Sequence, residues 1–89
     1  MEKNENQMLR AAILEVIQNQ IRDNDPPETR QTLERLLSHG YSEEEAFRLI
    51  GYVVASEVFS VLKHNRQYDH EKYISALHAL PELPWENDP

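Results

Sequence analysis

The sequence predicts an all-α fold: a single small helical bundle of about four helices, with a long central third helix and an extended C-terminal tail. Apolar residues recur at three- and four-residue spacing over long stretches, which is the period of an amphipathic helix. Prolines, a glycine and capping residues separate these stretches. The 89 residues, which include no cysteine, form one domain (1–89) whose small core depends on regular helix packing or self-association.

The first helix is expected over about 3–23. Its apolar positions are Leu9, Ile13, Val16, Ile17 and Ile21. Pro26 and Pro27 follow it, and the residue before a proline is driven out of the helical conformation. The chain must therefore turn between the first helix and the second.

The second helix is expected over about 26–39, with Asp25 as its N-cap and Pro26 at its first position. Its apolar face consists of Leu33, Leu36 and Leu37. Gly40 is suited to the left-handed position just past a helix end, which would bring Tyr41 back onto Leu36 in a Schellman motif.

The third helix, about 43–64, is the most apolar, and Ser42 with Glu45 forms a capping box at its start. Its broad face consists of Ala46, Phe47, Ile50, Val53, Val54, Val58 and Val61. A second, narrower stripe lies opposite and consists of Tyr52, Ala55, Phe59 and Leu62. Gly51 nearby permits the close approach of another backbone. A helix that is apolar on two sides is packed on two sides.

The last helix is expected over about 70–80, with Asp69 as its N-cap. Its buried positions are Tyr73, Ile74, Leu77 and Leu80. The tail, 81–89, is extended by its prolines, with Leu83 and Trp85 folding back over an open end of the bundle. Whether the last helix covers the narrow stripe of the third helix stays open at this point.

Charge argues against several classes of partner. Nine Lys and Arg against sixteen Asp and Glu give a net charge of −7, which repels nucleic acids and anionic membrane surfaces. The N-terminus lacks the pattern of a secretory signal, and no apolar run approaches the roughly 20 residues of a membrane span. A cytoplasmic protein is expected, and the absence of cysteine fits a reducing compartment.

Glu57 is the unusual residue of the third helix because it projects onto the broad apolar face. A buried carboxylate needs a partner. Gln20 occupies a similar position on the first helix, so a hydrogen bond between Gln20 and Glu57 is the favoured interpretation. The alternative is a catalytic or metal-binding carboxylate whose properties are perturbed by burial.

No catalytic or cofactor motif is present in the sequence. The histidines His39, His64, His70 and His78 lack the spacing that places two ligands on one helical face. No nucleophile has a base at recognisable spacing, and two glycines cannot build a phosphate-binding loop. We therefore expect no enzyme activity, cofactor, metal or small-molecule ligand.

The stretch ERLLSHGYSEEEAFRLI resembles the first loop and second helix of a ubiquitin-associated domain. That resemblance implies a ubiquitin-like or peptide partner held by the loop residues His39, Gly40 and Tyr41, together with apolar residues of a later helix. His39 stands where that family has methionine, and the following helix is longer than in that compact three-helix fold.

A longer stretch, from QNQIRDNDPPETRQTLERLLSHGYSEEEAFRLIGYVVASEVFSVLK to the closing LPELPWE, resembles a family of small bacterial helical proteins of unknown function. Members of that family carry histidines in the first helix and in an HEAIH-like stretch opening the third. This chain has EEAFR there, over 44–48. The resemblance implies a bacterial cytosolic helical domain and no particular activity.

The favoured function is a structural or protein-interaction module that self-associates, as a homodimer, through Tyr52, Ala55, Phe59 and Leu62, or that uses this stripe to hold another protein. The first alternative is an adaptor that binds a partner through the 39–41 loop. The second is a metal-binding or hydrolytic domain that uses Glu57 and histidines.

Overall fold

A computed structural model describes residues 2–87 and confirms the all-α prediction. The helices are α1 (Glu2–Asp23), α2 (Pro27–Ser38), α3 (Glu43–His64) and α4 (His70–Ala79), followed by a short 3₁₀ helix, η1 (Pro84–Asn87). Within residues 2–87 there is no β-strand. Each of the four α-helices begins and ends within one residue of its predicted bounds, and the last two residues of the predicted tail lie outside the described range.

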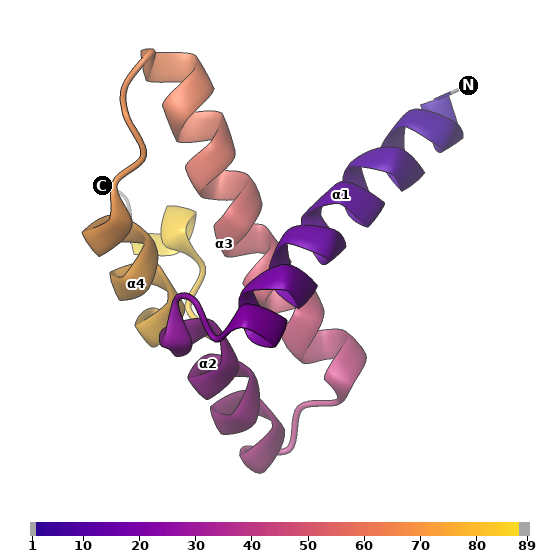
Figure 1. Ribbon diagram of the computed structural model, residues 1–89, viewed down its shortest axis with the longest axis vertical. Helices are drawn as coiled ribbons and strands as arrows, with labels where there is room; N and C mark the ends of the chain where they lie inside the picture. Colours follow the sequence, from indigo (N-terminus) through magenta and orange to yellow (C-terminus); the bar gives the residue numbers. More distant parts are fainter. Residues whose placement is uncertain (1, 88–89) are drawn as a thin grey trace.

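The two long helices, α1 and α3, cross near their middles and diverge on either side of the crossing (Figure 1). Helix α2 packs against both of them below the crossing, and α4 packs against α2 and α3. Beyond the crossing, the N-terminal half of α1 and the C-terminal half of α3 extend apart (Figure 1). We call these two halves the distal arms.

The hydrophobic core lies where the four helices meet. Each helix contributes a side chain that is at most 1% exposed: Ile17 from α1, Leu36 from α2, Ile50 from α3 and Leu77 from α4. Gly51 of α3 faces Ile13 and Ile17 of α1 at the crossing. A Cβ atom added there would lie 3.4 Å from Ile13 Cγ2 and 4.0 Å from Ile17 Cδ1, which are ordinary contact distances, so the crossing has room for a methyl group.

The connection between α2 and α3 forms as predicted. Gly40 adopts a φ of 97°, its N–H donates to Leu37 O and the Tyr41 N–H donates to Leu36 O, which is the Schellman pattern. Ser42 and Glu45 then exchange side-chain and backbone hydrogen bonds at 3.1 and 3.0 Å, completing the capping box. The turn is thereby fixed by local chemistry alone.

Two arginines of α2 bind the C-terminal ends of neighbouring helices. Arg30 donates to Ile21 O near the end of α1 at 2.7 Å. Arg35 donates to Leu77 O and Leu80 O at the end of α4, at 3.0 and 2.9 Å. The last carbonyls of a helix lack intrahelical partners, so these guanidinium groups satisfy them and tie α2 to both helices. The predicted N-cap role of Asp25 is wrong, because α2 is preceded by Pro26, without a side-chain cap.

The predicted broad apolar face of α3 is buried only along part of its length. Val53 and Val54 are in the core, whereas Val58 is 48% exposed and Val61 is half-buried. On α1, Leu9 and Val16 are likewise exposed although the helical pattern places them among the apolar positions. The reason is the divergence of the two long helices beyond their crossing.

The C-terminal tail is not extended as predicted. It turns after α4 and forms η1, with Leu83 packed against the core. Trp85 stays 53% exposed and places its ring edge against Tyr52, with the ring centroids 5.7 Å apart. The tail thus covers one side of α3 near the crossing and leaves the distal arm of α3 uncovered. Among the described residues, none of the helices combines the length and apolarity that crossing a membrane requires.

Replacing Gly51 with alanine is expected to raise the free energy of unfolding by about 0.5–1 kcal/mol, because the new methyl group meets Ile13 at an ordinary contact distance and alanine favours the helix. Gly51→Leu places too large a side chain in the crossing and is expected to lower the free energy of unfolding by about 1–3 kcal/mol. Urea denaturation measures both changes. A stabilising leucine would show that the crossing is not close-packed.

The capping box predicts a pH dependence. Hydrogen bonds from Ser42, first from its backbone N–H, hold the pKa of the Glu45 carboxyl below its ordinary value. A lowered native pKa contributes stability above the unfolded pKa of about 4.3, and this contribution is lost as pH falls through the native pKa. Glu45→Gln, which keeps an acceptor but does not titrate, should therefore lack this loss. Urea denaturation at pH 6 and pH 3 tests it, and a wild-type–variant difference that is the same at both pH values would contradict it.

Candidate interaction surface

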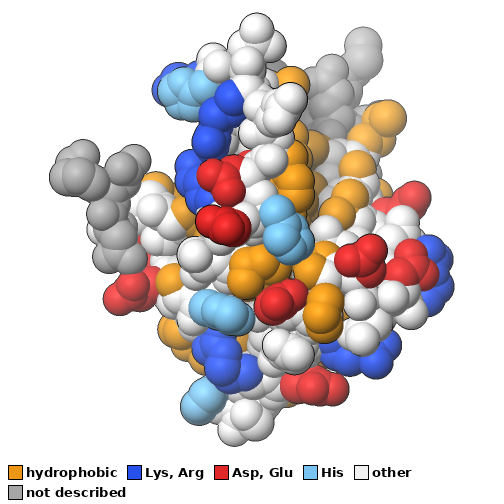
Figure 2. Space-filling view, turned by 60° about the vertical axis from the view of Figure 1, so that its left-hand side comes forward, with side chains coloured by type: hydrophobic (Ala, Val, Ile, Leu, Met, Phe, Trp, Pro, Cys, Tyr) orange, Lys and Arg blue, Asp and Glu red, His pale blue; other side chains and the backbone are white. Residues whose placement is uncertain are grey.

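The distal arms expose several large apolar side chains. Residues 7–12 of α1 are all exposed, with Met8 at 71% and Leu9 at 52%. On α3, Val58, Phe59 and Leu62 are 48%, 62% and 72% exposed. Figure 2 shows hydrophobic side chains gathered in a band on the upper part of the molecule and in the hollow beside it.

The middle parts of α1 and α3, on both sides of the crossing, are poor in charge, whereas the first turns of α1 carry Glu2, Lys3 and Glu5. Residues 49–62 contain one charged residue, Glu57, and residues 7–21 contain two, Arg10 and Glu15, in a chain that is 28% charged overall. Depletion of charge is the compositional mark of the central part of a protein–protein interface. The surface next to the crossing therefore differs in kind from the acidic remainder of the chain.

The molecule also exposes more surface than its mass requires. Its accessible surface is 6541 Å², whereas a folded monomer of 10.5 kDa exposes about 5,400 Å². The excess, about 1,100 Å², compares with the roughly 800 Å² that each partner buries in a standard interface. The radius of gyration, 13.1 Å, likewise exceeds the roughly 12 Å of a compact chain of this length.

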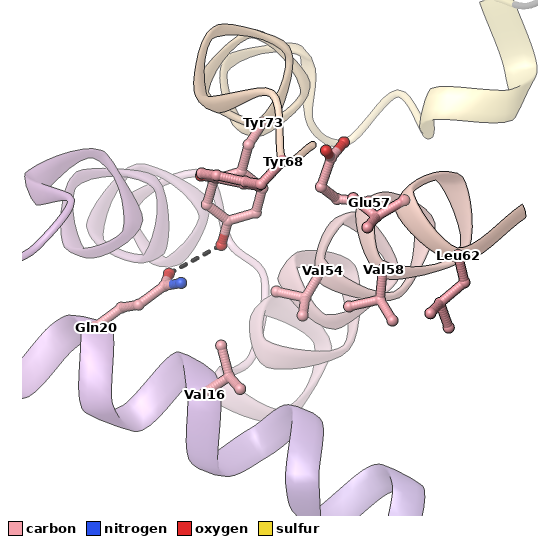
Figure 3. A pocket seen from close by; sticks show the side chains of 9 residues that line it. Val16, Gln20, Val54, Glu57, Val58, Leu62, Tyr68 and Tyr73 are labelled. Atoms are coloured by element: carbon pink, nitrogen blue, oxygen red, sulfur yellow. Dashed lines mark hydrogen bonds between the residues drawn. The ribbon is translucent and has the colours of Figure 1, made fainter. Parts of the chain in front are cut away.

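A groove of about 300 Å³ lies between α1, α3 and the start of α4 (Figure 3). We call it the first groove. Its lining is almost entirely apolar: Val16 faces Val54 and Val58 across it, and Leu62 closes its outer end. The full lining is Val16, Gln20, Val54, Glu57, Val58, Val61, Leu62, Tyr68 and Tyr73.

Gln20 and Glu57 both line the first groove, but the predicted hydrogen bond between them is not formed. Gln20 Oε1 accepts from Thr29 Oγ1 at 2.7 Å and from Tyr73 Oη at 2.9 Å. Glu57, which is 7% exposed, accepts from the Asp69 backbone N–H at 3.1 Å. The helical pattern predicts which side of its helix each residue faces. It does not predict that Thr29 of α2 and the backbone of Asp69 supply nearer hydrogen-bond donors.

Each of these polar groups has a structural explanation. Gln20 joins three helices, because Thr29 belongs to α2 and Tyr73 to α4. Glu57 lies at the N-terminal end of α4, where a helix dipole favours negative charge. Burial raises the pKa of the Tyr73 hydroxyl, against the opposing effect of its hydrogen-bonded neighbours Thr29 and Gln20. The first groove is therefore an apolar surface with a satisfied polar edge.

A second groove lies on the other side of the crossing. Tyr52 and Ala55 from the predicted stripe line it, together with the charged residues Arg10, Glu44 and Arg48. Glu44 and Arg48 pair at 3.7 Å.

The structure divides the predicted stripe of α3 into two parts. Tyr52 contacts Trp85 and Ala55 is half-buried, so this end is partly covered by the tail. Phe59 and Leu62 are exposed, and the last helix does not cover them. Sequence reasoning missed Val58, Met8 and Leu9 as members of the same exposed surface. The low charge of residues 7–21 was the signal that could have included α1.

The residues of the alternative partner loop, His39, Gly40 and Tyr41, make structural contacts within the turn between α2 and α3. His39 Nδ1 lies 2.8 Å from Arg35 O, Gly40 supplies the left-handed residue, and Tyr41 packs against the core. His70 makes an equally local contact, because its Nδ1 lies 3.0 Å from Tyr68 Oη. Among the side chains that the structure describes, no three His, Asp or Glu residues are grouped so as to hold a metal ion.

Tyr73→Phe is expected to lower the free energy of unfolding by about 1 kcal/mol, because it removes one hydrogen bond to the buried edge of Gln20 and leaves the ring in place. Tyr68→Phe is the matched control, since its hydroxyl bonds the exposed His70 and its loss should change stability by less than about 0.5 kcal/mol. Thermal or urea denaturation compares them. Equal effects would contradict a structural role for Gln20.

Comparison of the chain with protein-family models, with curated proteins and with solved structures finds no match.

Proposed function

We propose that this chain is a structural, self-associating helical interaction module, and that Val58, Phe59 and Leu62 on the distal arm of α3 belong to the surface that a second copy covers. The observation that carries the proposal is the surface excess of about 1,100 Å², which lies in the range that one subunit of a stable dimer buries. Within the predicted stripe, the proposal assigns self-association to Phe59 and Leu62, which are exposed.

A protein partner suits this surface better than other classes of partner. The exposed side chains are large, apolar and poor in charge, which is the character of an interface centre. The net charge of −7 disfavours nucleic acids and anionic lipid surfaces. A cytoplasmic location without enzyme activity is part of the same proposal.

A second copy is the partner that the geometry favours. One molecule carries two arms of similar length that diverge from one crossing (Figure 1), and each arm exposes large apolar side chains. A two-fold axis lets the same face meet itself, so both copies bury both arms without any further chain. Because each copy carries a charge of −7, added salt should strengthen the association by screening repulsion between them.

Light scattering across a tenfold dilution tests the proposal. The wild type is expected to have the mass of a dimer at the higher concentrations, and Phe59→Asp is expected to weaken association at least tenfold by placing a charge in the apolar contact. Leu37→Asp is the matched control, because Leu37 is 39% exposed on α2, outside the arms. A wild type that is monomeric at the highest concentration would contradict the proposal.

A further inference from the structure

We infer that the first groove binds the distal arm of α1 from a second copy, so that two molecules exchange these arms reciprocally. The inference rests on the proposed self-association and names the segment that performs it. Leu9, Ala12 and Val16 are its contact residues on α1.

The distal arm of α1 lacks tertiary packing within one copy. Residues 7–12 are exposed throughout, and most helical stability in proteins comes from tertiary packing of an apolar face. Leu9, Ala12 and Val16 fall at positions i, i+3 and i+7, so they share one face of the helix. None of the three is charged, and Val16 already belongs to the wall of the first groove.

The α3 wall of the first groove continues as an apolar row along the distal arm of α3. Val54, Val58 and Leu62 are spaced four residues apart on α3, and their exposure increases outward from 6% to 48% to 72%. The groove is therefore the closed inner end of an apolar surface that opens along both arms (Figure 3). A helix laid between the arms contacts both walls.

A second copy supplies such a helix and also receives one. When a two-fold axis relates two molecules, α1 of each lies between the arms of the other, and the four long helices form a common bundle. Each insertion buries Leu9 of one copy beside Val58 and Leu62 of the other. The second groove is less suited to this occupant, because Arg10, Glu44 and Arg48 line it.

Disulfide trapping tests the arrangement directly, because the chain contains no cysteine of its own. Differently tagged Leu9→Cys and Val58→Cys chains are mixed and oxidised. The arm exchange predicts at least tenfold more mixed disulfide dimer than for Leu9→Cys mixed with Leu37→Cys, in which the second cysteine lies on α2. Neither single-cysteine chain can form an internal disulfide, so every cross-link reports contact between copies.

A second pair of variants separates the two faces of α1. Leu9→Asp is expected to weaken dimerisation at least tenfold by light scattering, whereas Leu14→Asp, which places the charge on the second-groove side, is expected to change it less than threefold. Circular dichroism confirms that both remain folded, since both side chains are at least 40% exposed.

The outcomes distinguish this inference from the proposal on which it rests. A dimeric wild type in which Leu9→Cys and Val58→Cys do not cross-link above the control overturns the arm exchange and leaves self-association standing. An efficient Phe59→Cys homodisulfide in that case would assign the contact to α3 alone. A wild type that is monomeric at every concentration overturns both.

Discussion

The length of α2 and α4 is the constraint on which the rest of the structure depends. At 1.5 Å per residue, α1 and α3 are each about 33 Å long, whereas α2 is about 18 Å and α4 about 15 Å. Two short helices can therefore cover the long pair only on one side of the crossing. The core at Ile17 and Ile50 lies under this cover, and the distal arms lie beyond it.

The polar contacts between helices join α1, α3 and the two short helices that cover them. Among the residues that the structure describes, none of them links the distal arm of α1 to that of α3. Arg35 fixes α2 to α4, Gln20 joins α1 to both of them, and Glu57 holds the loop before α4 against α3. The contacts of Arg35 and Gln20 lie at or behind the crossing, whereas Glu57 lies beyond it and fastens the loop before α4 to the inner part of the α3 arm. The same feature explains the excess surface, because the parts of α1 and α3 beyond the cover stay exposed.

Local structure was predictable from the sequence because its signals are local. The Schellman turn at Gly40, the capping box of Ser42 and Glu45, and the cap of α4 at Asp69 each depend on residues within a few positions of one another. The angle between α1 and α3 depends on long-range packing, which periodicity does not contain. Val58 was therefore assigned to the core, and Gln20 was paired with Glu57 instead of with Thr29 and Tyr73.

Native-state hydrogen exchange of the α1 amides at several protein concentrations is the most direct test of the uncovered-arm arrangement. Protection of residues 7–12 is expected to lie well below that of the core around Ile50 at low concentration and to rise as association covers the arm, because only the arm depends on a second copy for its cover. Protection of the arm equal to that of the core at every concentration would show that α1 needs no partner. Fast exchange of the arm at every concentration would show that it finds none.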